Sequence, residues 1–308
     1  MVEKLMVIGK QINNNLKRNI LHITPGLSTG GAERALVRLI QTSDKNRLHH
    51  HVVSLTDYGT QGAELEKAGV AVDVLHISGP FSAPKGILRL RRITKSVKPD
   101  VVHGWMYHGG LFALFAESKT PKVLAIRHSL HDLKKDKKTT RTIIYLLARF
   151  SKRFKTVIFN SETSKKQHLA IGYDAGNSIF IPNGYDTNEF SPYSLQDKTR
   201  LRARLKLPEN DFVFGYVARH QPVKNHYGLL KALAEVVKHD SNVKLVLIGK
   251  RLSSKNNALE KTINQLDIAK HVTLLGERND IPELLQVLDV YVSPSNAEAF
   301  SAHREEMF

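Results

Sequence analysis

Two cations, Arg219 and Lys224, are the residues of this sequence best placed to act on a phosphorylated ligand. They follow an apolar run from Phe212 to Ala218, which is typical of a buried strand, and they precede leucines and valines at helical spacing over residues 229–237. Cations at the carboxyl end of a strand, beside a helix N-terminus, suit a diphosphate. The alternative is two surface cations in an ordinary strand-to-helix loop.

A glycine pair, Gly30 and Gly31, stands between another expected strand, residues 19–24, and another expected helix, whose apolar residues share one face over residues 32–40. Glycines at a helix start let a ligand approach bare backbone N–H groups. The spacing is not G-x-G-x-x-G, so a nicotinamide cofactor is not indicated. The alternative is a tight turn that needs glycine.

Strands and helices alternate along the chain, for example the strand expected at residues 71–77 and the basic helix at residues 85–97. This alternation predicts an α/β fold with doubly wound parallel sheets covered by helices on both faces. A stretch rich in Pro, Asn and Gly breaks the pattern after residue 181, and a second strand–helix series follows it. We therefore predict two domains that face each other across a cleft, at residues 18–186 and 201–308, with a hinge at residues 187–200.

The composition narrows the class of protein. A chain of 308 residues with 41% apolar content has enough hydrophobic residues for two cores. The absence of cysteine excludes disulfides and thiolate zinc sites. No apolar run approaches the roughly 18 residues that span a bilayer, and the N-terminus does not resemble a signal peptide, so a cytoplasmic protein is expected. His49, His50 and His51 are contiguous in an expected strand and cannot converge on one metal ion.

The net charge of +17 is concentrated in one region. Residues 85–166 hold 20 Lys and Arg against five Asp and Glu, a balance of 20 − 5 = +15. Such a face attracts anionic lipid or nucleic acid. The alternative is a solvated surface of a basic protein that binds no such partner. The sequence shows no nucleic-acid-binding module, so nucleic acid is not expected as a partner.

Taken together, ordered motifs over residues 19–301 resemble a known family. Those motifs are "GGAERAL", "PDVVHGWMYHGGL", "IRHS", "FNSE", "IPNGYDTNEFSP", "VARHQPVKNH", "LLGERNDIPELLQVLDVYVSPS" and "AEAFS". The chain resembles a retaining glycosyltransferase of family 4, with the two Rossmann-like domains of the GT-B fold. The resemblance implies transfer of a sugar from a nucleotide sugar, with retention at the anomeric carbon.

The resemblance also implies roles for residues by position. Arg219 and Lys224 match the pair that binds the donor diphosphate, and Gly30 and Gly31 match a loop that borders donor and acceptor. His128 in "IRHS" matches a histidine that faces the cleft near the transferred sugar, although a buried structural histidine is the alternative. His103 and Trp105 follow a strand end, where clefts form, and are weaker candidates. Asn183 and Gly184 are expected to shape the hinge.

Two carboxylates complete the implied site. Glu298 matches the first residue of the family's E-x7-E motif, which contacts hydroxyls of the donor sugar, and Glu306 stands at the second position. A helix-leading acid is the alternative for Glu298. The family pattern continues with apolar residues after Ser301 and through further strand–helix units, whereas this chain reads "AHREEMF". We therefore expect an incomplete second domain and poor or absent turnover.

The residue chemistry agrees with the implied reaction. Loss of a nucleoside diphosphate develops negative charge on the β-phosphate, and preplaced cations stabilise that charge most in the transition state. Arg219 and Lys224 can supply the charge that Mg²⁺ supplies elsewhere, and the chain has no Asp-x-Asp sequence, so we expect no metal or other cofactor. The expected catalytic residues are His128, Arg219, Lys224 and Glu298.

The resulting hypothesis is a glycosyltransferase of surface polysaccharide or lipopolysaccharide biosynthesis that is cytoplasmic and peripheral on the inner membrane. A UDP- or GDP-linked sugar is the expected donor, and a saccharide or lipid-linked molecule is the expected acceptor. One alternative is a nucleotide-sugar 2-epimerase of the same fold, which needs no acceptor. Another is an inactive remnant that binds only nucleotide or an anionic membrane.

Overall fold

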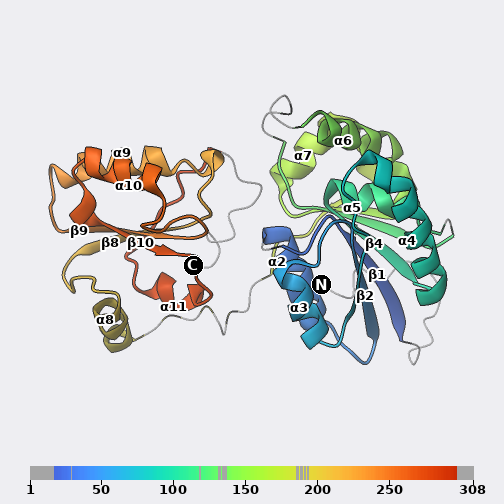
Figure 1. The fold of residues 1–308 in the computed structure, drawn as a ribbon, viewed down its shortest axis with the longest axis horizontal. Helices are drawn as coiled ribbons and strands as arrows, with labels where there is room; N and C mark the ends of the chain where they lie inside the picture. Colours follow the sequence, from blue (N-terminus) through green and yellow to red (C-terminus); the bar gives the residue numbers. More distant parts are fainter. Residues whose placement is uncertain are drawn as a thin grey trace. The chain divides into compact units, whose positions relative to one another are not determined.

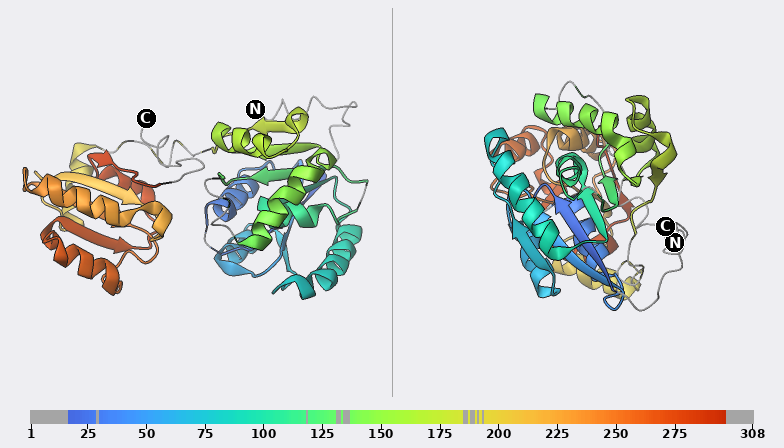
Figure 2. Two further views of the ribbon diagram at one scale, coloured as in Figure 1. Left: turned by 90° about the horizontal axis from the view of Figure 1, so that it is seen from above. Right: turned by 90° about the vertical axis from the view of Figure 1, so that its right-hand side faces the viewer.

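The computed structural model describes residues 17–28, 30–117, 119–130, 133, 137–184, 187, 190, 192 and 194–296. The chain divides into two compact units, which we call unit 1 (Met1–Asn183) and unit 2 (Gly184–Phe308). Each unit contains one parallel sheet with helices against it, as two further views also show (Figures 1 and 2).

The sheet of unit 1 has seven described strands in the order β3-β2-β1-β4-β5-β6-β7, all paired in parallel. The chain builds outward from β1 in one direction and then returns to build outward from β4 in the other, which is the doubly wound arrangement. The strands are β1 (Arg18–Thr24), β2 (Leu48–Ser54), β3 (Ala71–Val74), β4 (Val101–Trp105), β5 (Lys122–Ile126), β6 (Thr156–Phe159) and β7 (Ser178–Phe180).

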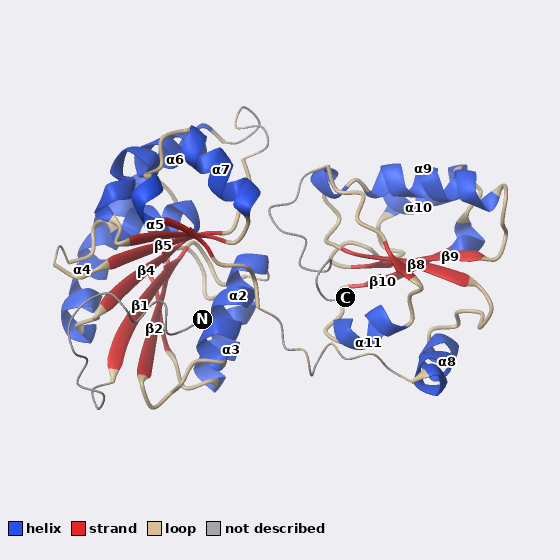
Figure 3. Cartoon of the chain, turned by 180° about the vertical axis from the view of Figure 1, so that it is seen from behind, coloured by secondary structure: helices blue, strands red, loops and turns tan. Residues whose placement is uncertain are grey.

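Helices cover both faces of this sheet (Figure 3). Buried side chains of α4, α5 and α6 share one core with β1, β4 and β5, whereas α2 and α3 form a second core on the opposite face. The helical segments are α2 (Gly31–Gln41), α3 (Gly59–Lys67), η1 (Pro80–Ser82), α4 (Ala83–Val97), α5 (Met106–Ala113), α6 (Lys138–Phe150), η2 (Ser151–Arg153), α7 (Glu162–Ala170) and η3 (Ala175–Asn177).

Glycine lets α5 lie directly on the sheet. A Cβ atom built on Gly109 would lie 2.3 Å from the carbonyl oxygen of Ile23 in β1, a distance that no side chain tolerates. The glycines of the "HGGL" stretch therefore serve helix–sheet packing in this structure.

Unit 2 has four described strands in the order β10-β9-β8-β11, again all parallel. They are β8 (Phe212–Val217), β9 (Val243–Ile248), β10 (Val272–Gly276) and β11 (Val290–Tyr291). The helical segments are α8 (Leu195–Arg204), η4 (Pro222–Lys224), α9 (His226–Val237), α10 (Asn257–Gln265), η5 (Ala269–His271) and α11 (Ile281–Gln286).

An ion pair between the buried Arg202 and the partly exposed Asp289 fastens α8 to this sheet. Arg202 donates from Nη2 to Asp289 at 2.6 Å, from Nε to the carbonyl of Val287 at 3.1 Å, and from Nη1 to the carbonyl of Glu209 at 2.8 Å. Asp289 also accepts from the backbone N–H of Val213 at 2.8 Å. Because its charge and its donors are satisfied inside the protein, Arg202 has a structural role.

The predicted α/β class with two doubly wound parallel sheets is confirmed. Two boundaries differ from the expectations. The strand expected over residues 71–77 ends at Val74, because His76 has a left-handed φ of 55° that no strand accommodates. The expected hinge at residues 187–200 overlaps α8, which begins at Leu195 because the Ser194 hydroxyl accepts from the N–H of Asp197 and caps the helix.

Candidate functional site

The loop after β8 presents Arg219 at the carboxyl edge of the unit 2 sheet. The N–H of Ala218 donates to Ile248, and the N–H of His220 donates to Lys250, both at 2.9 Å, so the loop continues the alignment of β8 with β9. Arg219 lies between these two bonds and is exposed. Its guanidinium has no hydrogen bond or ion pair within the described part of the chain.

Lys224 ends the short helix η4, two residues before α9 begins at His226. The next residue, Asn225, adopts a left-handed conformation with φ of 53°, and its Oδ1 accepts from the N–H of Gly228 at 3.3 Å. This cap fixes where α9 begins, and it holds Lys224 beside the helix N-terminus. The predicted strand, basic loop and helix are therefore present, with both cations on one loop.

A buried hydroxyl ties this loop to the chain that leaves β11. Tyr216 Oη lies 3.2 Å from the carbonyl oxygen of Lys224 and 2.6 Å from Ser295 Oγ. The N–H of Asn296 donates to the carbonyl of Val223 at 2.9 Å. We call these three bonds the Tyr216 clasp. Glu298 and Glu306 lie outside the described residues, so their predicted roles remain predictions.

A second pair of cations, Lys250 and Arg251, follows the neighbouring strand β9 and was missed in the sequence. Gly249 makes their loop possible, since its φ is +147° and a Cβ atom there would lie 2.2 Å from the carbonyl oxygen of Ala218. The pair could have been found by noting that adjacent parallel strands end at the same edge of a sheet. We call Arg219, Lys224, Lys250 and Arg251 the cationic edge of unit 2.

His226 lies directly behind this edge as the first residue of α9, and it is buried. Burial, with the neighbouring charges of His220 and Lys224, lowers the pKa of His226 to about 4. Its imidazole is therefore neutral near pH 7 and does not add to the charge of the loop. The ring packs against Tyr216 with ring centroids 5.1 Å apart, so it also supports the Tyr216 clasp.

In unit 1, Gly30 is the N-cap of α2 and Gly31 is its first residue, so the N-cap position itself offers no capping side chain. A Cβ atom on Gly31 would meet nothing within 4 Å, so the space around it is open. Gly30 has φ of −160°, an extended conformation that any residue adopts, so the backbone of the turn does not itself require glycine there. The preceding loop is fastened by Asp57, which accepts from the N–H of Leu27 at 3.3 Å.

His128 follows β5 and its side chain is exposed at the carboxyl edge of the unit 1 sheet. Its ring lies edge-on to Tyr107 with centroids 6.1 Å apart, and its carbonyl accepts from Ser164 Oγ at 2.6 Å. The neighbouring Arg127 donates to Asn183 Oδ1. The exposure of the imidazole at this edge suits the role that the sequence predicts for His128.

Trp105, in contrast, is part of the core. Its Nε1 donates to His22 Nδ1 at 3.2 Å, and His22 Nε2 lies 3.0 Å from His50 Nδ1. His50 Nε2 lies 2.8 Å from Ser43 Oγ, whose hydroxyl donates to the carbonyl of Ile40 at 2.7 Å. Neutral imidazoles satisfy this chain in one order, with His22 donating to His50 and His50 to Ser43. The chain ties the C-terminal end of α2 to β1, β2 and β4.

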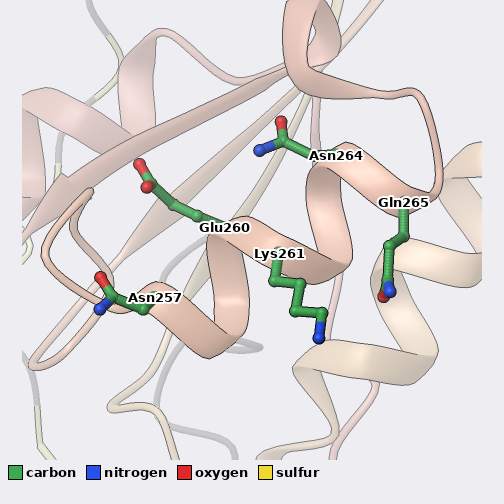
Figure 4. Close-up of a pocket in the computed structure, with 5 residues that line it drawn as sticks. All are labelled: Asn257, Glu260, Lys261, Asn264 and Gln265. Carbon is green, nitrogen blue, oxygen red and sulfur yellow. The ribbon is translucent and has the colours of Figure 1, made fainter.

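Two hollows of the described surface lie away from the cationic edge. One of about 550 Å³ runs along the outer face of α10 and is lined by polar side chains of that helix alone (Figure 4). Those side chains are Asn257, Glu260, Lys261, Asn264 and Gln265. No residue of the cationic edge lines it, so we assign it no role in the site. Among the described residues no cluster of His, Asp or Glu could hold a metal ion.

The comparisons with known proteins agree with the fold. The model "Glycosyl transferases group 1" matches residues 197–303, and "Glycosyltransferase Family 4" matches residues 29–189, more than half of the chain. EpsF of Bacillus subtilis (strain 168) is 26% identical over 297 residues, which are 92% of this chain and 74% of that protein.

A nucleotide sugar appears in the name of a second relative and in the description of a solved structure. The UDP-Gal:alpha-D-GlcNAc-diphosphoundecaprenol alpha-1,3-galactosyltransferase of Escherichia coli is 27% identical over 68% of this chain and 56% of its own length. The crystal structure of Anabaena HepE with UDP-glucose is 25% identical, with a TM-score of 0.78, over 94% of this chain and 77% of that one. The chain thus spans only part of the length of these relatives. On the match of the family model over residues 29–189, the chain belongs to Glycosyltransferase Family 4.

Proposed function

We propose that this chain transfers a sugar from a nucleotide-sugar donor to a saccharide or lipid-linked acceptor in surface polysaccharide or lipopolysaccharide assembly, with retention at the anomeric carbon. The observation that carries the proposal is the cationic edge of unit 2. Arg219 and Lys224 follow β8, Lys250 and Arg251 follow the adjacent β9, and α9 begins beside them. A diphosphate is the ligand whose charge and oxygen atoms fit this arrangement.

The cationic edge acts on the leaving group. As the bond between the sugar and the β-phosphate breaks, charge accumulates on the phosphate oxygens, and fixed cations stabilise that charge most in the transition state. Arg219 can grip two oxygens in a fork, whereas Lys224 supplies a point charge held by η4 and the Tyr216 clasp. In this proposal the cations do the work of a metal ion, and no carboxylate nucleophile is assigned.

The remaining site residues are assigned by analogy with the family. Gly30 and Gly31 border donor and acceptor, His128 lies near the transferred sugar, and Glu298 and Glu306 contact the donor sugar. UDP or GDP is the proposed donor nucleotide. HepE was crystallised with UDP and with UDP-glucose, and the name of the Escherichia coli relative specifies UDP-galactose, which supports UDP.

The acceptor and the location are proposed together. The name of the Escherichia coli relative specifies a diphosphoundecaprenol-linked acceptor. An acceptor of that kind would bring this chain to the cytoplasmic face of the inner membrane as a peripheral protein. In the described part of the chain, no helix combines the length and the apolar character that crossing a membrane requires.

Calorimetry against UDP, GDP, ADP and their sugars tests the proposal. Arg219→Ala and Lys224→Ala should each weaken binding of the preferred nucleotide by roughly 10- to 100-fold, the effect of losing a charge-assisted hydrogen bond of about 1.5–3 kcal/mol. Lys261→Ala is the matched control, because it removes an exposed cation on α10 outside the cationic edge. Nucleotide binding that is equal in all four proteins would place the diphosphate elsewhere. Consumption of donor without acceptor, with isomerised or free sugar as product, would favour an epimerase.

A further inference from the structure

The outer surface of α4 and the turn before it expose large apolar side chains. Phe81, in η1, is fully exposed at 101% of its reference area, and Leu88, on α4, is 59% exposed. Leaving both in water is unfavourable by the hydrophobic effect, and neither contributes to a core of unit 1. Isolated exposed apolar residues are common on proteins, so the residues around Phe81 and Leu88 are needed to indicate whether this surface binds a partner.

Those neighbours are cations on the same helical face. Lys85, Leu88, Arg92 and Lys95 recur at intervals of three and four residues and are all exposed, and Phe81 lies four residues before Lys85. The opposite face carries residues buried against the sheet and α5, among them Gly86, Leu90 and Thr94. We call Phe81, Lys85, Leu88, Arg92 and Lys95 the α4 stripe.

Within the described part of the chain, no carboxylate pairs with the cations of the α4 stripe. Residues 78–98 contain six Lys and Arg and no Asp or Glu. Two of those arginines are used internally, since Arg89 donates to the carbonyl of Val74 at 2.8 Å and Arg91 donates to the carbonyl of Phe115 at 3.2 Å. In contrast, Lys85, Arg92 and Lys95 have no ion pair within the described part of the chain.

The exposed surface of α6, which packs on the same face of the sheet as α4, is also both apolar and basic. Tyr145 and Leu146 of α6 are also exposed, and Arg149 follows them one turn later. Both α4 and α6 pack on the face of the sheet opposite α2 and α3 (Figures 1 and 3). Residues of the α2–α3 face therefore play no part in this surface.

We propose that the α4 stripe is the surface by which this protein docks on an anionic lipid bilayer. A helix that lies in the plane of a membrane interface carries aromatic and aliphatic side chains that enter about 5–10 Å, with Lys and Arg at the level of the headgroups. Phe81 and Leu88 supply the first and Lys85, Arg92 and Lys95 the second, so the stripe matches a bilayer in both charge and polarity. A nucleic acid would match the cations but not Phe81 and Leu88. The proposal identifies the surface that would hold this protein at the membrane. It rests on the proposed function only for the reason that the protein would dock there.

The experiment is cosedimentation of the full chain with vesicles of phosphatidylglycerol and phosphatidylcholine, and with vesicles of phosphatidylcholine alone. The parent should bind the anionic vesicles, with binding that weakens between 0.05 M and 0.15 M salt because exposed charges are screened. Phe81→Ser with Leu88→Ser leaves the net charge unchanged and should weaken binding by at least about tenfold, because the apolar contribution is lost.

A charge variant and a matched control separate the α4 stripe from the overall basicity. Each cation near an anionic surface contributes roughly fivefold, so replacing three should weaken binding by about 100-fold. The charge variant is Lys85→Gln, Arg92→Gln and Lys95→Gln. The control removes three exposed cations of a basic hollow at the amino edge of β5 and β6 and should bind nearly as the parent does. That control is Lys119→Gln, Arg153→Gln and Lys155→Gln.

Each contrary outcome is decisive. Equal losses in the charge variant and the control would show attraction by net charge alone and overturn the proposal, as would vesicle binding by the Phe81 and Leu88 variant at parental strength. Self-association of the parent that this variant abolishes would show that a second copy covers the surface instead. Trp105 fluorescence confirms that each variant is folded, and nucleotide calorimetry should be unchanged in all of them. A parent that binds vesicles but no nucleotide would contradict the proposed function and leave this inference standing.

Discussion

Lowering the pH from 7.5 to 5.0 is expected to destabilise unit 1 by several kcal/mol, through histidines that are buried as neutral imidazoles. His168 is fully buried, with its Nδ1–H donating to the carbonyl of Ser164 at 2.7 Å and its Nε2 accepting from the hydroxyl of Tyr107 at 2.9 Å. Burial lowers the pKa of His168 to about 4. Burial, with the nearby charge of Arg127, lowers the pKa of His103 to about 3.

The direction of this pH effect follows from the number of protons that the folded and the unfolded states bind. An unfolded chain titrates these imidazoles near pH 6.5, so at pH 5 it binds protons that the folded state does not. Their stabilising contribution is fully present above pH 6.5 and is lost as the pH falls toward 4 for His168 and toward 3 for His103. At pH 5 the loss is about 2 kcal/mol for each group, or about 4 kcal/mol for the two. That is a large part of the 5–15 kcal/mol that typical domains possess.

Urea denaturation followed by tryptophan fluorescence measures this effect in unit 1 specifically, because Trp105 is the single tryptophan of the chain and is only 3% exposed. His168→Gln should lower the free energy of unfolding at pH 7.5 by about 1–2 kcal/mol through its lost hydrogen bonds. The same variant should reduce the further loss between pH 7.5 and 5.0 by about 2 kcal/mol. His239→Gln, at an exposed position of unit 2, is the control and should keep the parental pH dependence of unit 1. A His168→Gln protein whose stability falls with pH as steeply as the parent's would refute the reasoning.

Three further changes test the framework around the site. Asp289→Asn leaves the buried Arg202 charge uncompensated and should destabilise unit 2 by about 3–5 kcal/mol, seen as faster amide exchange in β8; parental exchange would contradict it. Gly109→Ala places a Cβ atom 2.3 Å from the Ile23 carbonyl oxygen and should lower the free energy of unfolding, measured by Trp105 fluorescence, by about 1–3 kcal/mol; a parental value would show that α5 shifts to make room. Tyr216→Phe removes the hydroxyl that holds the Lys224 turn and should weaken nucleotide binding about three- to tenfold in calorimetry; unchanged affinity would show that the Tyr216 clasp does not position Lys224.

Much of the fold could be predicted from the sequence, because its strands are local apolar runs such as Phe212–Val217 and its helices have regular apolar spacing. The boundaries were less predictable where single residues decide them. The end of β3 depends on the backbone of His76, and the start of α8 depends on the Ser194 cap. Neither feature appears in a hydrophobic pattern.

The candidate site could be predicted only where its residues are close together in the sequence. Arg219 and Lys224 lie on one loop, so their spacing was readable directly. Lys250 joins them only because β9 pairs with β8, and the pairing of strands belongs to the tertiary structure. The hydrogen-bonded chain from Trp105 through His22 was equally hidden, because its members are 83 positions apart and meet only when β1 and β4 pair.

Arg202 and Arg219 of unit 2 show why residue type alone does not identify a site. Arg202 lies in a strongly charged stretch that reads as a surface helix, yet its side chain is buried, with donors committed to Asp289 and to backbone carbonyls, and nothing is left for a ligand. Arg219 is exposed, and its guanidinium has no partner within the described residues, so its five N–H donors are available to phosphate oxygens. The charge of Arg202 therefore holds α8 to the sheet, whereas that of Arg219 is hydrated at the surface and is open to an anion. For that reason replacing Arg219 should lower nucleotide affinity while leaving the free energy of unfolding within about 0.5 kcal/mol of the parent, a combination that replacing Arg202 cannot produce.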